Sequence, residues 1–198
     1  MNIGQIISFG SYEWRVLDAQ KDKALIITDA IIDQRPYHSA YTQITWAACS
    51  LRDYLNNDFY NSFTTEQRER IEPALNKNHD NEWYGTPGGI DTLDKIFLLS
   101  IDDAVCRYFG DSKSLLTNPG KNQRYWFQRK DVNNNKRVAY HNNGAAWWWL
   151  RSPGRVGVKA AYIHGDGNIG IQGNNIQKGN LDEGSCKGGV RPALWLKI

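Results

Sequence analysis

The sequence predicts an α+β domain, in which short helices are segregated from antiparallel β-sheets. Three observations predict this class: apolar runs joined by tight turns over residues 3–32, two helix-type patterns between residues 45 and 72, and β-type sequence again from Trp147 onward. The 198 residues suffice for one core without covalent staples. We expect a single domain over residues 1–198, with a meander and helices in 1–110 and a loop-rich half with closing strands in 111–198.

The first strands are predicted by hydrophobic periodicity. Tyr12, Trp14 and Val16 alternate with polar neighbours, which is the period-two pattern of a half-buried strand. Residues 24–28 are apolar throughout, as in a strand that is covered on both faces. Because the intervening turns are short, the pairing is expected to be antiparallel.

A first helix is predicted from Thr45, which is a suitable N-cap residue. Trp46, Leu51, Leu55 and Phe59 recur near helical spacing, with polar residues between them. The pattern indicates an amphipathic helix whose apolar face packs against the core.

Two further starts of helices carry capping signals. Thr64 and Gln67 have the spacing of a capping box, and so do Ser100 and Asp103. Residues 95–99, which are apolar except for Lys95, predict a buried strand just before the second box. We therefore interpret Asp103 as a structural cap and not as a catalytic group.

Polar loops are expected at residues 76–92, 118–146 and 172–188. Asparagine-rich runs at 133–135 and 141–144 favour turns, because Asn tolerates left-handed backbone and bonds its own main chain. Asp166-Gly167 predicts the turn of a β-hairpin.

Three consecutive tryptophans mark the centre of the fold. In an extended segment Trp147 and Trp149 share one face and Trp148 takes the other, so both faces are expected to be covered. Arg151 follows and is expected to stack on aromatic rings and to pair with a carboxylate. Residues 190–196 predict a closing strand.

Composition argues against a nucleic-acid partner and against membrane insertion. The net charge is +3 with no basic cluster, so no nucleic acid is expected. No apolar run approaches the ~20 residues that a membrane-spanning helix needs, so no membrane insertion is expected. The start of the sequence shows no signal peptide, which predicts a cytoplasmic location as the chain is written.

No metal or cofactor site is expected. The three cysteines, at positions Cys49, Cys106 and Cys186, are far apart and form no CxxC pair. Two alternatives stay open for them: three reduced thiols, or one disulfide with one thiol left over. The four histidines lack ligand spacing, and the residues after Asp166 fail the EF-hand pattern, because Gly170 stands at the third ligand position.

Several motifs together carry a family resemblance. They are ISFG at 7–10, WRVL at 14–17, LRDYLN at 51–56, DKIFLLS at 94–100, WWLRSPG at 148–154 and GVRPALWL at 189–196. On these motifs the chain resembles DUF6273, a bacterial domain family of unassigned function. That family is similar to the C-type-lectin-like proteins, a group that also holds formylglycine-generating enzymes and the variable proteins of diversity-generating retroelements.

The resemblance implies a C-type-lectin-like α+β fold: paired terminal strands, antiparallel sheets, two main helices outside and a loop-rich half that presents a binding face. It also implies a bacterial or phage origin. The chain departs from the wider group at three points. It lacks the Glu-Pro-Asn and Gln-Pro-Asp tripeptides of calcium-dependent lectins, it lacks clustered histidines, and Cys186 stands alone in its half.

We expect a non-enzymatic recognition domain that binds a protein or a glycan through its polar-aromatic loops, because aromatic, Arg and Asn side chains are typical of binding surfaces. The retroelement relatives suggest a more specific version, in which the loop positions vary. The expected contact residues are Trp83, Tyr84, Tyr125, Trp126, His141, Asn143, Trp148, Arg155 and Asn174. The structural motif residues are Trp147, Trp149, Arg151 and Arg191.

Two alternatives stay open. One is an enzyme of the formylglycine-generating type or a degenerate relative, which would need a reactive partner thiol for Cys186. The other is a structural module of a larger surface or phage protein.

Overall fold

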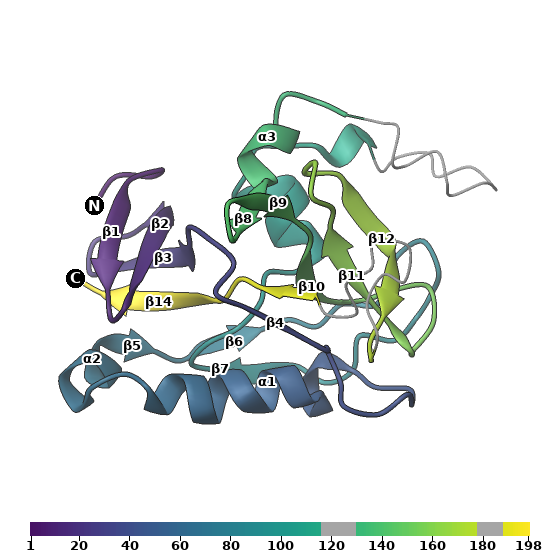
Figure 1. The fold of residues 1–198 in the computed structure, drawn as a ribbon, viewed down its shortest axis with the longest axis horizontal. Helices are drawn as coiled ribbons and strands as arrows, with labels where there is room; N and C mark the ends of the chain where they lie inside the picture. The colour runs from purple at the N-terminus through teal and green to yellow at the C-terminus, as the bar shows by residue number, and fades with distance from the viewer. Residues whose placement is uncertain (116–129, 178–187) are drawn as a thin grey trace.

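Two five-stranded sheets organise the chain. A computed structural model describes residues 1–115, 130–177 and 188–198. The N-terminal sheet lies at the left of Figure 1 and has the order β1-β2-β3-β14-β5, with every pair antiparallel. Its strands are β1 (Ile6–Phe9), β2 (Tyr12–Ala19), β3 (Lys23–Thr28), β5 (Ile71–Glu72) and β14 (Ala193–Lys197).

The second sheet has the order β12-β11-β10-β13-β4. Its strands are β4 (Asp33–Arg35), β10 (Trp148–Pro153), β11 (Lys159–Ile163), β12 (Ile169–Asn175) and β13 (Gly188–Val190). The pairing of β10 with β13 is parallel, at Trp148 and Gly189, and the other pairs are antiparallel. The α+β class with mainly antiparallel sheets is therefore confirmed.

The segment expected as one closing strand is two strands in different sheets. β13 ends at Val190, and β14 begins at Ala193 in the N-terminal sheet. Pro192 lies between them, and proline cannot donate to a ladder. Because of this break, β13 pairs with the tryptophan strand β10, whereas β14 pairs with β3.

The first helix begins later than its sequence predicts. Thr45 precedes a 3₁₀ turn, η1 (Trp46–Ala48), but its side chain caps nothing. The cap of the α-helical part is Cys49, whose Sγ accepts from the Arg52 amide at 3.4 Å. The helix then continues from α1 (Ser50–Tyr54) into a wider π-helical turn, η2 (Leu55–Phe59).

Both capping boxes are confirmed. Thr64 and Gln67 bond each other's amides at the start of α2 (Thr65–Arg70). Ser100 and Asp103 do the same ahead of η3 (Asp103–Arg107), at 2.9 and 3.0 Å. The remaining short helices are η4 (Lys113–Leu115) and α3 (Asn134–Arg137).

Two small hairpins complete the described chain, β6 (Ala74–Asn76) with β7 (Thr92–Asp94) and β8 (Ala139–His141) with β9 (Gly144–Ala146). The turn of the second hairpin has positive φ at Asn142 and Asn143, as its sequence predicts. The expected strand at residues 95–99 is wrong. This run is largely buried, but it forms only one isolated bridge, between Phe97 and Ala193.

The tryptophan strand is covered on both faces, as expected. Trp147 and Trp149 pack edge to face with ring centroids 4.7 Å apart. Trp148 lies on the opposite face, where its Nε1 donates to the Arg137 carbonyl at 3.0 Å. All three rings are at most 4% exposed, so the strand forms the centre of the core.

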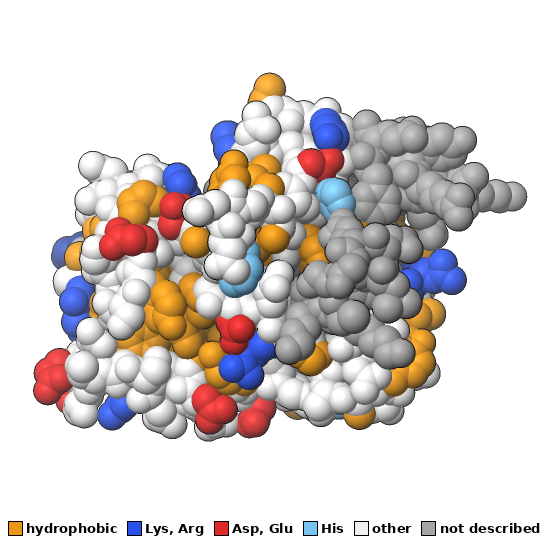
Figure 2. Space-filling view, in the orientation of Figure 1, with side chains coloured by type: hydrophobic (Ala, Val, Ile, Leu, Met, Phe, Trp, Pro, Cys, Tyr) orange, Lys and Arg blue, Asp and Glu red, His pale blue; other side chains and the backbone are white. Residues whose placement is uncertain are grey.

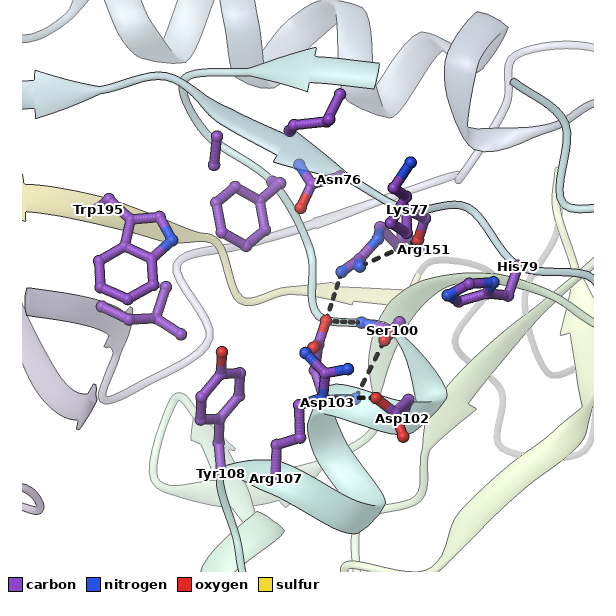
Figure 3. A pocket seen from close by; sticks show the side chains of 14 residues that line it. Asn76, Lys77, His79, Ser100, Asp102, Asp103, Arg107, Tyr108, Arg151 and Trp195 are labelled. Atoms are coloured by element: carbon purple, nitrogen blue, oxygen red, sulfur yellow. Dashed lines mark hydrogen bonds and ion pairs between the residues drawn. The ribbon is translucent and has the colours of Figure 1, made fainter. Parts of the chain in front are cut away.

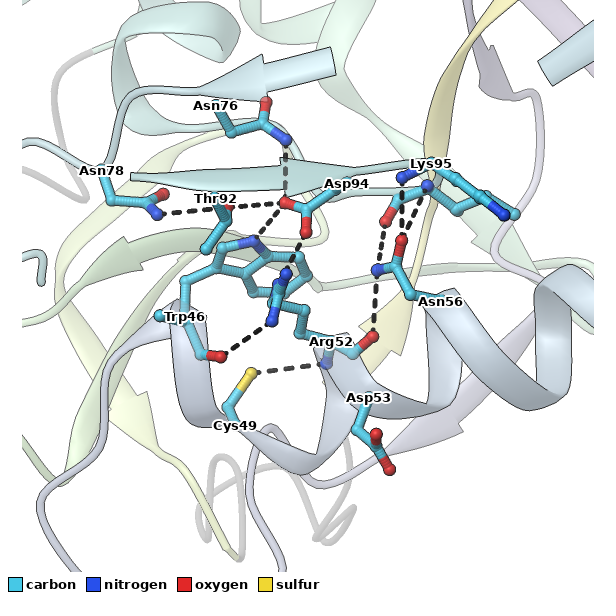
Figure 4. A network of polar contacts seen from close by, with 12 residues as sticks. Trp46, Cys49, Arg52, Asp53, Asn56, Asn76, Asn78, Thr92, Asp94 and Lys95 are labelled. Atoms are coloured by element: carbon cyan, nitrogen blue, oxygen red, sulfur yellow. Dashed lines mark hydrogen bonds and ion pairs between the residues drawn. The ribbon is translucent and has the colours of Figure 1, made fainter. Parts of the chain in front are cut away.

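Two of the sequence motifs meet at a buried carboxylate (Figure 4). Asp94 accepts from Trp46 Nε1, Asn76 Nδ2 and Thr92 Oγ1, and from Arg52 Nε at 2.6 Å. This network fastens the β6–β7 hairpin to the first helix. The LRDYLN and DKIFLLS motifs are therefore structural partners of each other.

Figure 2 shows hydrophobic side chains gathered between the N-terminal sheet and α1, with charged side chains of both signs scattered around them. Over the described residues, no helix is both long and apolar enough to cross a membrane.

Candidate functional site

A cleft lies between the segment that follows β6 and the helix η3 (Figure 3). It has an inner hollow of about 160 Å³ over Arg151 and an outer hollow of about 310 Å³ beside Trp83. We call both hollows together the Arg151 cleft. The two hollows are neighbours, because four residues line both of them: His79, Ser100, Asp102 and Arg107.

An ion pair forms the floor of the inner hollow. Arg151 Nη1 lies 2.6 Å from Asp103 Oδ2, and both residues are less than 10% exposed. The same Nη1 also donates to the Leu98 carbonyl at 2.9 Å, whereas the buried Nε has no hydrogen-bond partner in the described chain. Arg151 thus pairs with a carboxylate, as expected, although its sequence did not identify Asp103 as the partner.

The pKa of Asp103 reflects two opposing causes. Burial alone would raise it, but the charge of Arg151 and the hydrogen bonds from Ser100 lower it below its ordinary value. At neutral pH Asp103 is therefore an ionised acceptor that cannot serve as a proton donor. It positions Arg151 and begins η3.

The rim of the cleft carries a second ion pair. Arg107 Nε lies 2.6 Å from Asp102 Oδ2, with side chains that are 60% and 47% exposed. His79 and Lys113 are exposed nearby. Because cations and carboxylates alternate along the rim, the cleft offers hydrogen-bonding groups without a strong excess of either charge.

The segment that holds Trp83 is fixed by a buried asparagine. Asn81 Nδ2 donates to the carbonyls of Pro153 at 2.8 Å and Ile171 at 2.9 Å, which ties this loop to the second sheet. Gly88 closes the loop against its own start, since a Cβ at that position would lie 2.1 Å from the Asn78 carbonyl oxygen. The wall of the cleft is therefore built of anchored backbone.

Neither described cysteine has the character of a nucleophile. Burial, with the nearby Asp102, raises the pKa of Cys106 to about 11 in the outer hollow. Burial also raises the pKa of Cys49 to about 12. Both residues are free thiols and are protonated at neutral pH, while Cys186 lies outside the described residues.

The structure brings three of the expected contact residues near one another. Trp83 is half-buried in the outer hollow, and the neighbouring Tyr84 is half-buried against the core. Burial raises the pKa of Tyr84, and the nearby charge of Arg155 partly opposes this shift. Arg155 is exposed at the end of β10.

Among the expected contact residues in the described chain, only Trp83 lines the Arg151 cleft. Asn174 is half-buried on β12, and its Nδ2 has no hydrogen-bond partner in the described chain. His141 and Asn143 lie on the β8–β9 hairpin, where the His141 ring is 3.4 Å from the Ile31 carbonyl.

One expected contact residue is corrected. Trp148 has no exposed surface, and its ring packs against Phe109 and the Arg191 guanidinium. It is a core residue that offers no face to a ligand. Tyr125 and Trp126 lie outside the described residues.

Most residues that line the cleft could not be identified from the sequence. His79, Asp102 and Arg107 line it, yet none carries a motif that marks a binding role. The only available signal was the capping box, which placed residues 100–103 at the start of a helix. No group of three His, Cys, Asp or Glu side chains that could hold a metal ion occurs among the residues the structure describes.

Comparison with protein families gives one match. The model of the family described as a domain of unknown function, DUF6273, matches residues 21–198. Neither the curated proteins nor the solved structures include a significant match. Because the family model covers most of the chain, including the tryptophan strand and the closing strands, the chain belongs to the DUF6273 family.

Proposed function

We propose that this chain is a non-enzymatic recognition domain that binds a protein or a glycan, and that the Arg151 cleft is part of its binding face. The observation that carries the proposal is the position of Trp83. A half-buried indole lines an open hollow of about 310 Å³ whose other lining residues are polar or charged apart from Ile101 and Cys106. Apolar surface beside a few fixed polar groups is the usual composition of a ligand site.

The pairing of charges limits the kinds of ligand that the cleft can attract. Arg151 is paired with Asp103 and Arg107 with Asp102. Such pairs keep hydrogen-bonding capacity at their edges, but they give no net attraction for a charged ligand. We therefore propose a ligand surface that is neutral and polar, presenting hydroxyl or amide groups and one flat apolar face for the indole ring.

The enzyme alternative has less support. A formylglycine-generating mechanism needs a reactive thiol pair, and the raised pKa values of Cys49 and Cys106 oppose that role for the two described cysteines. The finer fold assignment, to the C-type-lectin-like group, is also part of the proposal. The arrangement of a C-terminal strand inside the N-terminal sheet supports it.

A binding screen tests the proposal. The intact chain is applied to an array of glycans and to a panel of surface proteins, and each hit is repeated with Trp83→Ala. We expect the substitution to weaken binding by about tenfold or more, since truncating an aromatic anchor costs about 2 kcal/mol, and to leave the melting temperature nearly unchanged.

Tyr41→Ala is the matched control, because Tyr41 is an aromatic residue that is 61% exposed and lies outside the cleft lining. It should leave the affinity unchanged. Equal affinities of the wild-type and Trp83→Ala proteins for the ligand would exclude the cleft as part of the binding face. Loss of folding in Trp83→Ala would instead assign the ring to the core.

A further inference from the structure

A second cavity, of about 530 Å³, lies between the N-terminal sheet and the segment from η3 to β8. Figure 2 shows the surface hollowed at this junction, with basic side chains on both sides. Its volume falls within the range of roughly 300–1,000 Å³ that is typical of small-molecule sites. Tyr108 is the one described lining residue that it shares with the Arg151 cleft.

An unpaired cation lies in the wall of this cavity. Arg191 is 1% exposed. Its Nε donates to the Thr28 carbonyl at 2.9 Å and its Nη2 to the Asp29 carbonyl at 3.2 Å. Its buried Nη1 has no hydrogen-bond partner within the described ranges. Both acceptors are neutral, so no carboxylate is bonded to this guanidinium.

The other charged groups of the lining do not neutralise it. Arg15 and Lys136 are basic, and Asp29 is the one carboxylate among the described lining residues. Asp29 already accepts from Arg15 through Oδ1, at 2.6 and 3.0 Å. Three cations therefore face one carboxylate, which leaves two positive charges in excess.

Arg191 keeps its charge at neutral pH. Burial lowers its pKa to about 10, and the nearby Asp29 and Arg15 act on it in opposite directions. Its guanidinium carbon lies 5.1 Å from the Trp148 ring centroid and 5.7 Å from that of Phe109. These cation–π contacts support the group, but they supply no hydrogen-bond acceptor for Nη1.

Most of the remaining lining is apolar, with Asn135 as a polar exception. Val16, Leu17 and Phe109 form a buried floor, while Ile3 and Tyr140 lie exposed at the rim. Such a surface suits a hydrocarbon or aromatic body and gives a bare inorganic ion little to contact.

We propose that this cavity binds an organic anion, with its carboxylate or phosphate group directed to the accessible cations Arg15 and Lys136 and its apolar body against the floor. The positive charge of Arg191 in the cavity wall adds to the attraction without a direct hydrogen bond, because its Nη1 is buried. Charge-assisted hydrogen bonds are roughly twice as strong as neutral ones, so the anionic group should dominate the affinity.

Calorimetric titration of the intact chain tests the proposal with four probes: octyl phosphate, nonanoate, octanol and inorganic phosphate. We expect at least one of the two amphiphilic anions to bind about tenfold or more tightly than octanol and than phosphate alone. The stronger anion then identifies the preferred head group. NMR spectra should show shifts for the amides of Gly110 and Val16, which line the cavity.

Lys136→Gln and Arg15→Gln should each weaken binding of the anion about fivefold or more, with little effect on octanol. Lys21→Gln is the matched control, because it removes the same charge from an exposed turn outside the cavity. Absence of binding at about 1 mM, equal affinities for octanol and the anions, or equal losses in Lys21→Gln and Lys136→Gln would overturn the proposal.

Discussion

The buried pair of Arg151 and Asp103 allows a quantitative test of what holds the Arg151 cleft together. In Arg151→Ala the Asp103 carboxylate loses the donor that lies 2.6 Å away and keeps its hydrogen bond from the Ser100 amide and the charge of the nearby Arg107. Removing one partner of a buried ion pair typically costs about 3–5 kcal/mol, because the remaining charge is uncompensated. We expect a loss at the upper end of this range, because Arg151 also donates to the Leu98 carbonyl.

The measurement is urea unfolding followed by tryptophan fluorescence, combined with scanning calorimetry. A loss of about 3–5 kcal/mol corresponds to a fall in melting temperature of roughly 6–20 °C for a chain of this size. Arg151→Lys is the control. It keeps the charge but not the planar fork, and it should lose less than Arg151→Ala.

A double-mutant cycle separates the pair from other effects. Asp103→Leu combined with Arg151→Met removes both charges, so the double variant should be more stable than the sum of the single losses predicts. The reasoning is refuted if Arg151→Ala changes the free energy of unfolding by less than about 0.5 kcal/mol, or if the two single losses simply add.

Three further results are expected. Trp149→Ala should lose about 3–5 kcal/mol, because it removes a ring with no exposed surface that packs on Trp147 and Tyr37; a folded variant of wild-type stability in urea would contradict this. Since the pKa of Asp103 is lowered in the folded state, its contribution to stability should be complete above about pH 4 and be lost as the pH falls through the folded-state value. This contribution is measured by comparing the urea midpoints of wild type and Asp103→Asn at low and at neutral pH. An equal fall of the midpoint in both proteins would contradict the prediction. The Cys106 thiol should react with iodoacetamide at pH 7 at least about tenfold more slowly than an unperturbed thiol, because its pKa is raised. Mass spectrometry measures the rate, and rapid alkylation would contradict the raised pKa.

Local signals in the sequence predicted local structure well. The capping boxes at Thr64 and Ser100, the alternation around Trp14 and the faces of the tryptophan strand depend on neighbours a few residues apart, and all are confirmed. Their physical causes, hydrogen bonds to nearby amides and the two-residue repeat of a strand, are visible in any window of the chain.

Contacts between distant residues could not be predicted in this way. Arg151 and Asp103 are 48 positions apart, and no spacing rule connects them. Residues 95–99 were expected to form a strand because they are apolar except for Lys95, but burial alone does not supply a hydrogen-bonded neighbour. Pro192 divides the closing segment between two sheets, which only the arrangement of the sheets makes visible.

The position of β14 has a consequence for how the protein is made. In its sheet, β14 lies between β3 and β5, so an interior strand follows both of its neighbours in the sequence. While the ribosome is still adding residues 193–197, β3 and β5 have no partner on their facing edges, and open strand edges favour pairing with other chains. Completion of the sheet must therefore wait until translation has passed this segment, and a nascent chain halted before it would be prone to aggregate.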